Sequence, residues 1–130
     1  MIKSSADAEY RKTKDSLRGR DYSAPFVSFY DSAKCRPNCK TMCISYNAII
    51  RMGFPERVDA LYDDETKTLT IVPEVDGRLA LYKFANRRTY KNTCTITRFL
   101  DYCGLDINKY KGRYYGKIVD GTFVCELYEK

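Results

Sequence analysis

The chain has 130 residues, of which 44% are hydrophobic, so it fits one domain with a packed core and excludes an intrinsically disordered protein. No apolar run approaches the about 20 residues of a membrane span, and residues 1–5 lack the hydrophobic segment of a secretory signal. We therefore expect a cytoplasmic protein with no membrane partner, whose six cysteines remain reduced thiols.

The 23 Lys and Arg residues outnumber the 17 Asp and Glu residues and leave a net charge of +6. Such a surplus favours polyanionic partners, above all nucleic acid, although ordinary solubilising charge has the same bias. The chain has no histidine, which removes the commonest general base, the Ser–His and Cys–His nucleophile pairs and every zinc site that uses histidine. We expect a binding protein rather than an enzyme, with no catalytic residues and no cofactor.

Residues 1–24 are polar and charged, with only scattered apolar side chains. We interpret them as a flexible basic N-terminal arm that ends at Pro25. Residues 25–130 are interpreted as a single domain, because patterns of strands and short helices begin at Phe26 and continue through the rest of the chain.

The first unit of this domain combines strand patterns with one short helix. Ser45 is a good N-cap, and Gly53 is a natural stop for the helix that follows it. Residues 63–67 form a turn between two alternating segments, which predicts a β-hairpin. The expected elements are a strand over 26–30, a turn over 36–38, a short strand over 41–44, a helix over 46–52, and hairpin strands over 57–62 and 68–72.

The second unit repeats this order. Thr97 is expected to be the helix N-cap and Gly104 the helix stop, and Asp120-Gly121 is a strong two-residue hairpin signal. The expected elements are a strand over 78–82, a polar connection over 86–88, a short strand over 92–96, a helix over 98–103, and hairpin strands over 113–119 and 122–128.

Shifting the chain by 51 places lays one unit over the other, and the matching order of elements predicts an internal duplication with repeats over about 26–76 and 77–130. The aligned pairs include Cys43 with Cys94, Ile49 with Leu100, Gly53 with Gly104, Phe54 with Leu105, Arg36 with Arg87, and Lys40 with Lys91. One unit cannot bury both faces of its strands, whereas two units can if each hairpin completes the other's sheet. The expected fold class is therefore α+β, mainly β with short helices: a two-copy, pseudo-twofold swapped-hairpin β-barrel with one short helix per copy.

The segment over 41–73 resembles the AbrB/SpoVT/MraZ swapped-hairpin family, in which a short strand leads into a small helix ending at Gly, followed by a hairpin that ends near a proline. The likeness lies in Ile44-Ser45, Ile49-Ile50, Met52-Gly53, and the segments over 58–62 and 69–73. Members similar to MraZ carry two units per chain, in agreement with the duplication. The resemblance implies a DNA-binding regulator, an antitoxin, or a protein of a phage or mobile element.

In a two-copy barrel, matching basic positions would form one bipartite surface. Lys and Arg neutralise phosphates, and Arg also reads guanine edges. Tyr82 and Tyr90 lie among these charges and are candidates for base stacking, the alternative being core or rim positions of strands. The predicted nucleic-acid-binding residues are Arg36, Lys40, Lys83, Arg87, Arg88, Lys91 and Arg98, with Lys34 widening the surface.

Two further patterns favour structural explanations. Cys35, Cys39 and Cys43 have three residues between each, which differs from the two-residue knuckle of most zinc sites and from the common iron–sulfur spacings, so we predict no metal ligands. The acidic run over 63–65 lacks the ligand alternation of an EF-hand, and hairpin turn chemistry accounts for it.

The sequence thus predicts a nucleic-acid-binding protein, with double-stranded DNA as the favoured partner, acting as a transcriptional regulator or a mobile-element accessory factor. The alternative is a protein-interaction module with a protein partner, such as an antitoxin or an anti-CRISPR-like phage inhibitor of a nucleic-acid enzyme. Tandem copies favour the first, because a pseudo-dimer has the symmetry to meet duplex DNA. We expect a monomer with pseudo-dimer symmetry or a homodimer.

Overall fold

The computed structural model describes residues 24–32, 39–83 and 90–130. In this part of the chain the fold is mainly β, with eight antiparallel strands in one sheet and only short helices. The elements are β1 (Phe26–Asp31), β2 (Lys40–Ile44), α3 (Tyr46–Arg51), β3 (Arg57–Asp63), β4 (Thr68–Pro73), β5 (Leu79–Ala80), β6 (Thr93–Thr95), α4 (Thr97–Cys103), α5 (Ile107–Tyr110), β7 (Gly112–Val119) and β8 (Thr122–Glu126).

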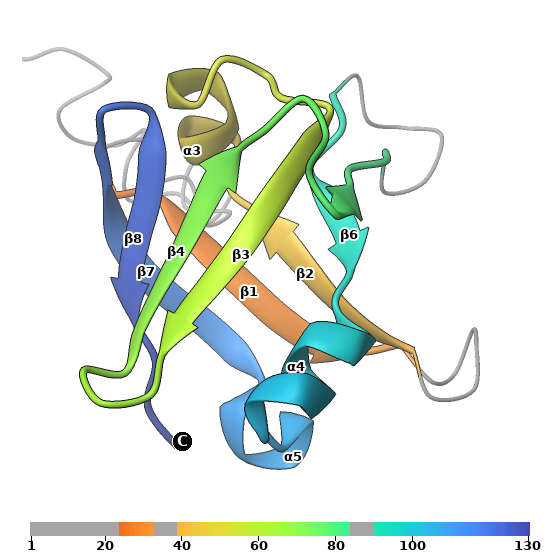
Figure 1. The fold of residues 1–130 in the computed structure, drawn as a ribbon, viewed down its shortest axis with the longest axis vertical. Helices are drawn as coiled ribbons and strands as arrows, with labels where there is room; N and C mark the ends of the chain where they lie inside the picture. The colour runs from red at the N-terminus through yellow and green to blue at the C-terminus, as the bar shows by residue number, and fades with distance from the viewer. Residues whose placement is uncertain (1–23, 33–38, 84–89) are drawn as a thin grey trace, which may run out of the picture.

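The strands follow the order β5-β3-β4-β8-β7-β1-β2-β6 and curl into a nearly closed barrel (Figure 1). The two ends of the sheet meet where Tyr82, just after β5, forms an antiparallel bridge with Thr93 of β6. In Figure 1, α3 covers one end of the barrel, and α4 and α5 cover the other. The expected fold class is therefore confirmed at the level of a mainly β barrel with short helices.

The core lies inside the ring of strands. Because side chains alternate between the two faces of a strand, every second residue of β4 and of β8 points inward. The short helices add Ala48 and Ile49 at one end, and Leu100 and Ile107 at the other. The largest fully buried side chains are Tyr114, Phe29, Phe123, Met42, Ile44, Ile49, Leu69, Ile71, Ile96, Leu100, Leu127 and Val27.

Three of the four predicted helix signals are confirmed. The Ser45 hydroxyl oxygen accepts the N–H of Ala48 (3.2 Å) and also that of Phe26 (3.0 Å), so one side chain caps α3 and ties it to β1. Gly53 and Gly104 follow α3 and α4 with φ angles of +83° and +72°, in the left-handed region that glycine adopts without a Cβ penalty.

The predicted N-cap at Thr97 is wrong. Ile96 occupies the cap position without a side-chain hydrogen bond, and Thr97 is the first residue of α4. The Thr97 hydroxyl instead accepts the backbone N–H of Lys40, at 2.8 Å. A buried strand N–H without a partner costs more than an unfilled cap, so the long-range bond prevails over the local one.

The sequence patterns also missed one element and overestimated another. The single turn of α5 begins after Asp106, whose carboxylate accepts the N–H of Asn108 at 2.9 Å. One turn is too short to show helical periodicity. The strand expected over 78–82 is shorter, because only Leu79 and Ala80 pair with β3.

Three predictions concern residues outside the described part of the chain: most of the N-terminal arm, the turn over 36–38 and the connection over 86–88. Among the described helices, none is both long enough and apolar enough to span a bilayer.

Tyr114 of β7 tests how strongly the barrel depends on a buried hydroxyl. Its side chain is 1% exposed, and its hydroxyl lies 2.6 Å from the Tyr110 carbonyl oxygen and 3.0 Å from that of Tyr128. Tyr114→Phe should lower the free energy of unfolding by about 1–2 kcal/mol, because these carbonyls lose their donor. Urea denaturation measures the change.

The matched control is Tyr115→Phe at the next position, where the ring is half-exposed and the hydroxyl accepts a hydrogen bond from the Arg113 guanidinium. Its expected effect is within about 0.5 kcal/mol. Equal effects of the two substitutions would contradict this account of Tyr114.

Candidate nucleic-acid interface

Of the seven predicted binding residues, four are described by the structure: Lys40, Lys83, Lys91 and Arg98. Arg36, Arg87 and Arg88 lie outside the described residues, as does Lys34.

The pairing of β2 with β6 places the four described cations. Lys40 begins β2, and its N–H bonds to Thr97, so Lys40 and Arg98 lie at one end of this ladder. At the other end, the Asn92 carbonyl accepts the N–H of Ile44 at 2.8 Å, and Lys91 directly precedes Asn92. The cations therefore form two groups at opposite ends of one barrel wall rather than one continuous patch.

The end that carries Lys91 also holds a hollow of about 410 Å³. Lys83 and Lys91 both line it, which brings together two of the predicted residues. The Lys91 ammonium lies 3.4 Å from a carboxylate oxygen of Glu56, an exposed ion pair that is weak in water. The lining residues are Tyr46, Phe54, Pro55, Glu56, Lys83, Tyr90 and Lys91.

Three aromatic rings meet at this hollow. The Tyr46 ring centroid lies 4.5 Å from that of Tyr90 and 6.4 Å from that of Phe54. Tyr90 thus belongs to an aromatic cluster beside two lysines. Tyr82 is 38% exposed and bridges to β6, which places it on the rim of the barrel.

Phe54 is held in an uncommon conformation. It follows Gly53 with φ of +52°, a left-handed value that costs a bulky residue about 1–2 kcal/mol. Its N–H donates to the Ile49 carbonyl at 2.9 Å, which closes the end of α3. The ring is nevertheless 51% exposed, so core burial does not account for it. Sequence reasoning missed Tyr46 and Phe54 as site residues, because only the fold brings them beside Tyr90.

The net positive charge is not spread evenly along the chain. The described residues contain thirteen of the 23 Lys and Arg residues and thirteen of the 17 Asp and Glu residues, so their charges balance. The other ten basic and four acidic residues lie in 1–23, 33–38 and 84–89, and together they account for the whole surplus of +6. The two internal segments carry Lys34, Arg36, Arg87 and Arg88 and no acidic residue.

A second set of cations, which the sequence reasoning did not select, lies on β7 and at the end of the chain. The Arg113 guanidinium stands 4.1 Å from the centre of the Phe26 ring and donates to the Tyr115 hydroxyl at 3.1 Å. The Lys130 ammonium donates to the Arg113 carbonyl at 2.7 Å and lies 4.3 Å from the Tyr114 ring centre. These contacts give both cations a role within the barrel.

The cysteines do not assemble into a cluster among the described residues, where no three His, Cys, Asp or Glu side chains are placed to hold a metal ion. Cys39 and Cys43 are partly buried, and Cys35 lies outside the described ranges. In the acidic run, the Asp63 carboxylate accepts the N–H of Glu65 at 2.9 Å, which lowers the pKa of Asp63. This bond is the expected turn chemistry of a hairpin.

Thiol reactivity should follow burial. Burial raises the pKa of both Cys94 and Cys125 to about 12, so both remain neutral thiols at pH 8. Because the thiolate is the nucleophile, iodoacetamide at pH 8 should spare these two residues in the folded protein while it modifies Cys39 and Cys43. Peptide mass spectrometry reads the pattern.

The same reaction in guanidinium chloride is the control, in which all these cysteines should be modified. Rapid labelling of Cys94 without denaturant would show that the β2–β6 wall opens.

Comparison of the chain with protein-family models, with curated proteins and with solved structures returned no match to any of them.

Proposed function

We propose that this chain binds nucleic acid, with duplex DNA as the favoured form, through the barrel wall formed by β2 and β6 and the segments that adjoin it. The observation that carries the proposal is the distribution of charge along the sequence: residues 24–32, 39–83 and 90–130 contain equal numbers of basic and acidic residues, and the cationic surplus belongs to residues 1–23, 33–38 and 84–89. Nucleic-acid affinity depends on such concentrated positive charge, because each neutralised phosphate releases counterions.

The position of these segments supports the proposal. One joins β1 to β2 and carries Lys34 and Arg36, and the other joins β5 to β6 and carries Arg87 and Arg88. The residues that flank the first segment, Ser32 and Cys39, lie beside the Lys40 end of the β2–β6 ladder. The residues that flank the second segment, Lys83 and Tyr90, lie beside the other end, where Lys91 is found. β2 is five residues long, which corresponds to about 13 Å between its ends. That spacing is close to the about 12 Å width of the DNA major groove.

We infer that the two halves of the barrel are related copies that exchange their hairpins. If β1 is interchanged with β5, β2 with β6, β3 with β7 and β4 with β8, the order of strands around the ring is unchanged. In particular, β3 of the first half pairs with β5, just as β7 of the second half pairs with β1. Each hairpin thereby completes the sheet of the other half.

Individual hydrogen bonds support the same relation. The N–H of Ile44 donates to the Asn92 carbonyl, and in the other half the N–H of Ile96 donates to the Lys40 carbonyl, both at 2.8 Å. In the strands, Lys40 therefore corresponds to Asn92, one residue beyond the Lys91 that the sequence shift aligned with it. After α3 and α4, Gly53 and Gly104 make the same pattern of bonds, and there the shift of 51 fits.

A pseudo-twofold barrel with described cations at each end of one wall, Lys40 and Arg98 at one and Lys83 and Lys91 at the other, is suited to the two strands of a duplex. This arrangement supports a role as a transcriptional regulator or a mobile-element accessory factor, as the resemblance to the AbrB/SpoVT/MraZ family implies. The aromatic cluster of Tyr46, Phe54 and Tyr90 adds stacking contacts at one end.

Fluorescence anisotropy with a random duplex at 50 and 200 mM salt tests the proposal. We expect the affinity of the unmodified protein to fall by on the order of a thousandfold, which corresponds to about six neutralised phosphates. Lys83→Ala with Lys91→Ala, and Lys40→Ala with Arg98→Ala, should each weaken binding about tenfold and reduce the salt slope by about two. Arg36→Ala with Arg87→Ala should do the same.

Lys67→Ala with Lys117→Ala is the charge-matched control. Lys67 precedes β4, and Lys117 pairs with β8, so both lie away from the β2–β6 wall. Binding that does not depend on salt, or an equal loss in the control variant, would contradict the proposed surface.

A further inference from the structure

In the described part of the chain, one edge of β3 is paired over only part of its length. The Arg57 carbonyl accepts the N–H of Glu74 beside β4, and the Glu56 carbonyl accepts the N–H of Leu81 beside β5. Consecutive residues of a strand direct their backbone N–H and C=O groups to opposite sides. Because the backbone groups of Arg57 face β4, those of the odd-numbered residues up to Asp63 do so too, and the N–H and C=O groups of Ala60 and Tyr62 point away from β4. On that side β5 covers only Arg57 and Val58. Within the described residues, the N–H and C=O groups of Ala60 and Tyr62 therefore have no backbone partner.

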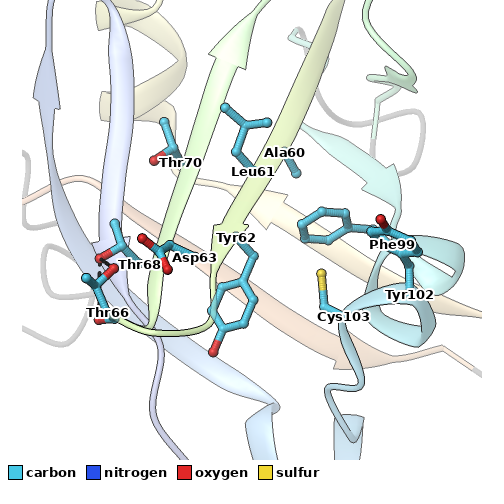
Figure 2. A pocket seen from close by; sticks show the side chains of 10 residues that line it. All are labelled: Ala60, Leu61, Tyr62, Asp63, Thr66, Thr68, Thr70, Phe99, Tyr102 and Cys103. Carbon is cyan, nitrogen blue, oxygen red and sulfur yellow. Dashed lines mark hydrogen bonds between the residues drawn. The ribbon is translucent and has the colours of Figure 1, made fainter.

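This edge borders a groove of about 470 Å³ between the β3–β4 hairpin and α4 (Figure 2). In Figure 2 the Phe99 ring extends from α4 toward β3. Leu61 is 58% exposed and Tyr102 is 89% exposed, so the groove has apolar side chains that the barrel core does not use. The lining residues are Ala60, Leu61, Tyr62, Asp63, Thr66, Thr68, Thr70, Phe99, Tyr102 and Cys103.

The surroundings of the groove are acidic. Asp63 lines it, Asp64 and Glu65 continue the hairpin turn, and all three are exposed. Asp101 adds a carboxylate on the exposed part of α4. Lys67 and Arg98 are the neighbouring cations in the turn and on α4, so the acidic groups outnumber the basic ones. A ligand that complements this charge is cationic.

We propose that the β3 edge at residues 60–63 binds an extended, positively charged segment of a partner protein as an added strand. The backbone of the segment pairs with the N–H and C=O groups of Ala60 and Tyr62. Its apolar side chains lie over Leu61 and Tyr102, and its cationic side chains lie beside the carboxylates of the hairpin turn. An exposed strand edge is a ready template for such pairing. This site adjoins Arg98 on α4, but none of its lining residues belongs to the proposed nucleic-acid interface, and the proposal does not depend on nucleic-acid binding.

The probe for this site is a synthetic hexapeptide of alternating lysine and valine with blocked ends. Its control is the same peptide with N-methyl groups on alternate backbone nitrogens, which keeps the charge and removes the donors that face β3. We expect calorimetry to show binding of the first peptide and at least tenfold weaker binding of the second. Equal binding of the two peptides would overturn the proposal, because charge alone would then explain the contact.

Ala60→Pro tests the same edge from the protein side. Proline removes an N–H that faces the groove and leaves the β3–β4 ladder bonds in place. It should weaken peptide binding at least tenfold, whereas Ala60→Ser, which keeps the N–H, should not. Unchanged affinity in Ala60→Pro would overturn the proposal, and the N-methyl comparison on the unmodified protein decides the question if this variant fails to fold.

Sedimentation of the unmodified chain distinguishes binding of a partner protein at the β3 edge from pairing of that edge with a second copy of this chain. A dimer that Ala60→Pro abolishes, together with no peptide binding, would overturn the assignment to a partner protein. Duplex binding in Ala60→Pro should remain unchanged, so failure at this edge is distinguishable from failure of the nucleic-acid interface.

Discussion

The barrel depends on hydrogen bonding between strands that are far apart in the sequence. β4 pairs with β8 and β2 pairs with β6, and these two ladders join the first half of the chain to the second on two sides of the barrel. Each hairpin alone has one face that would remain in water, and only closure of the ring buries both sets of inward side chains. The fully buried positions of Leu69, Ile71 and Phe123 are a consequence of that closure.

The described residues of the barrel contain equal numbers of basic and acidic side chains. Arg113 on β7 and Lys130 contact aromatic rings, and each donates a hydrogen bond within the barrel, whereas Lys83 and Lys91 line a hollow beside the β2–β6 wall. The groove beside β3 has mostly acidic surroundings, so we propose a cationic partner there and nucleic acid at the β2–β6 wall. Two such surfaces fit on one small barrel, because the core occupies the inside of the ring.

Local chemistry was predictable from the sequence. Ser45 as a cap, Gly53 and Gly104 as helix ends and the Asp120-Gly121 turn all depend on contacts within a few residues, and each occurs as expected. Thr97 was mispredicted because its hydroxyl serves Lys40, 57 residues away in the chain, and no local pattern indicates that bond. The single turn of α5 gave no periodic signal.

The candidate sites show the same difference between local features, which the sequence predicts, and long-range contacts, which it does not. Lys83 and Lys91 could be selected by residue type, but their shared hollow with Tyr46 and Phe54 exists only because α3 packs beside the end of β6. The free edge at Ala60 could not be predicted either, because the sequence suggested a longer partner strand than β5 proves to be.

The connection between β4 and β5 packs on β3: the N–H of Glu74 donates to the Arg57 carbonyl at 3.1 Å, and the N–H of Arg78 donates to the Asp59 carboxylate at 2.8 Å. It is also a tether, because four strand ladders (β5–β3, β4–β8, β7–β1 and β2–β6) run between the residues before it and those after it. Such a tether acts by raising effective concentration, typically to the millimolar range for a short link. A chain cleaved at this link would consist of two fragments, each of which lacks the partner strands that complete its part of the ring.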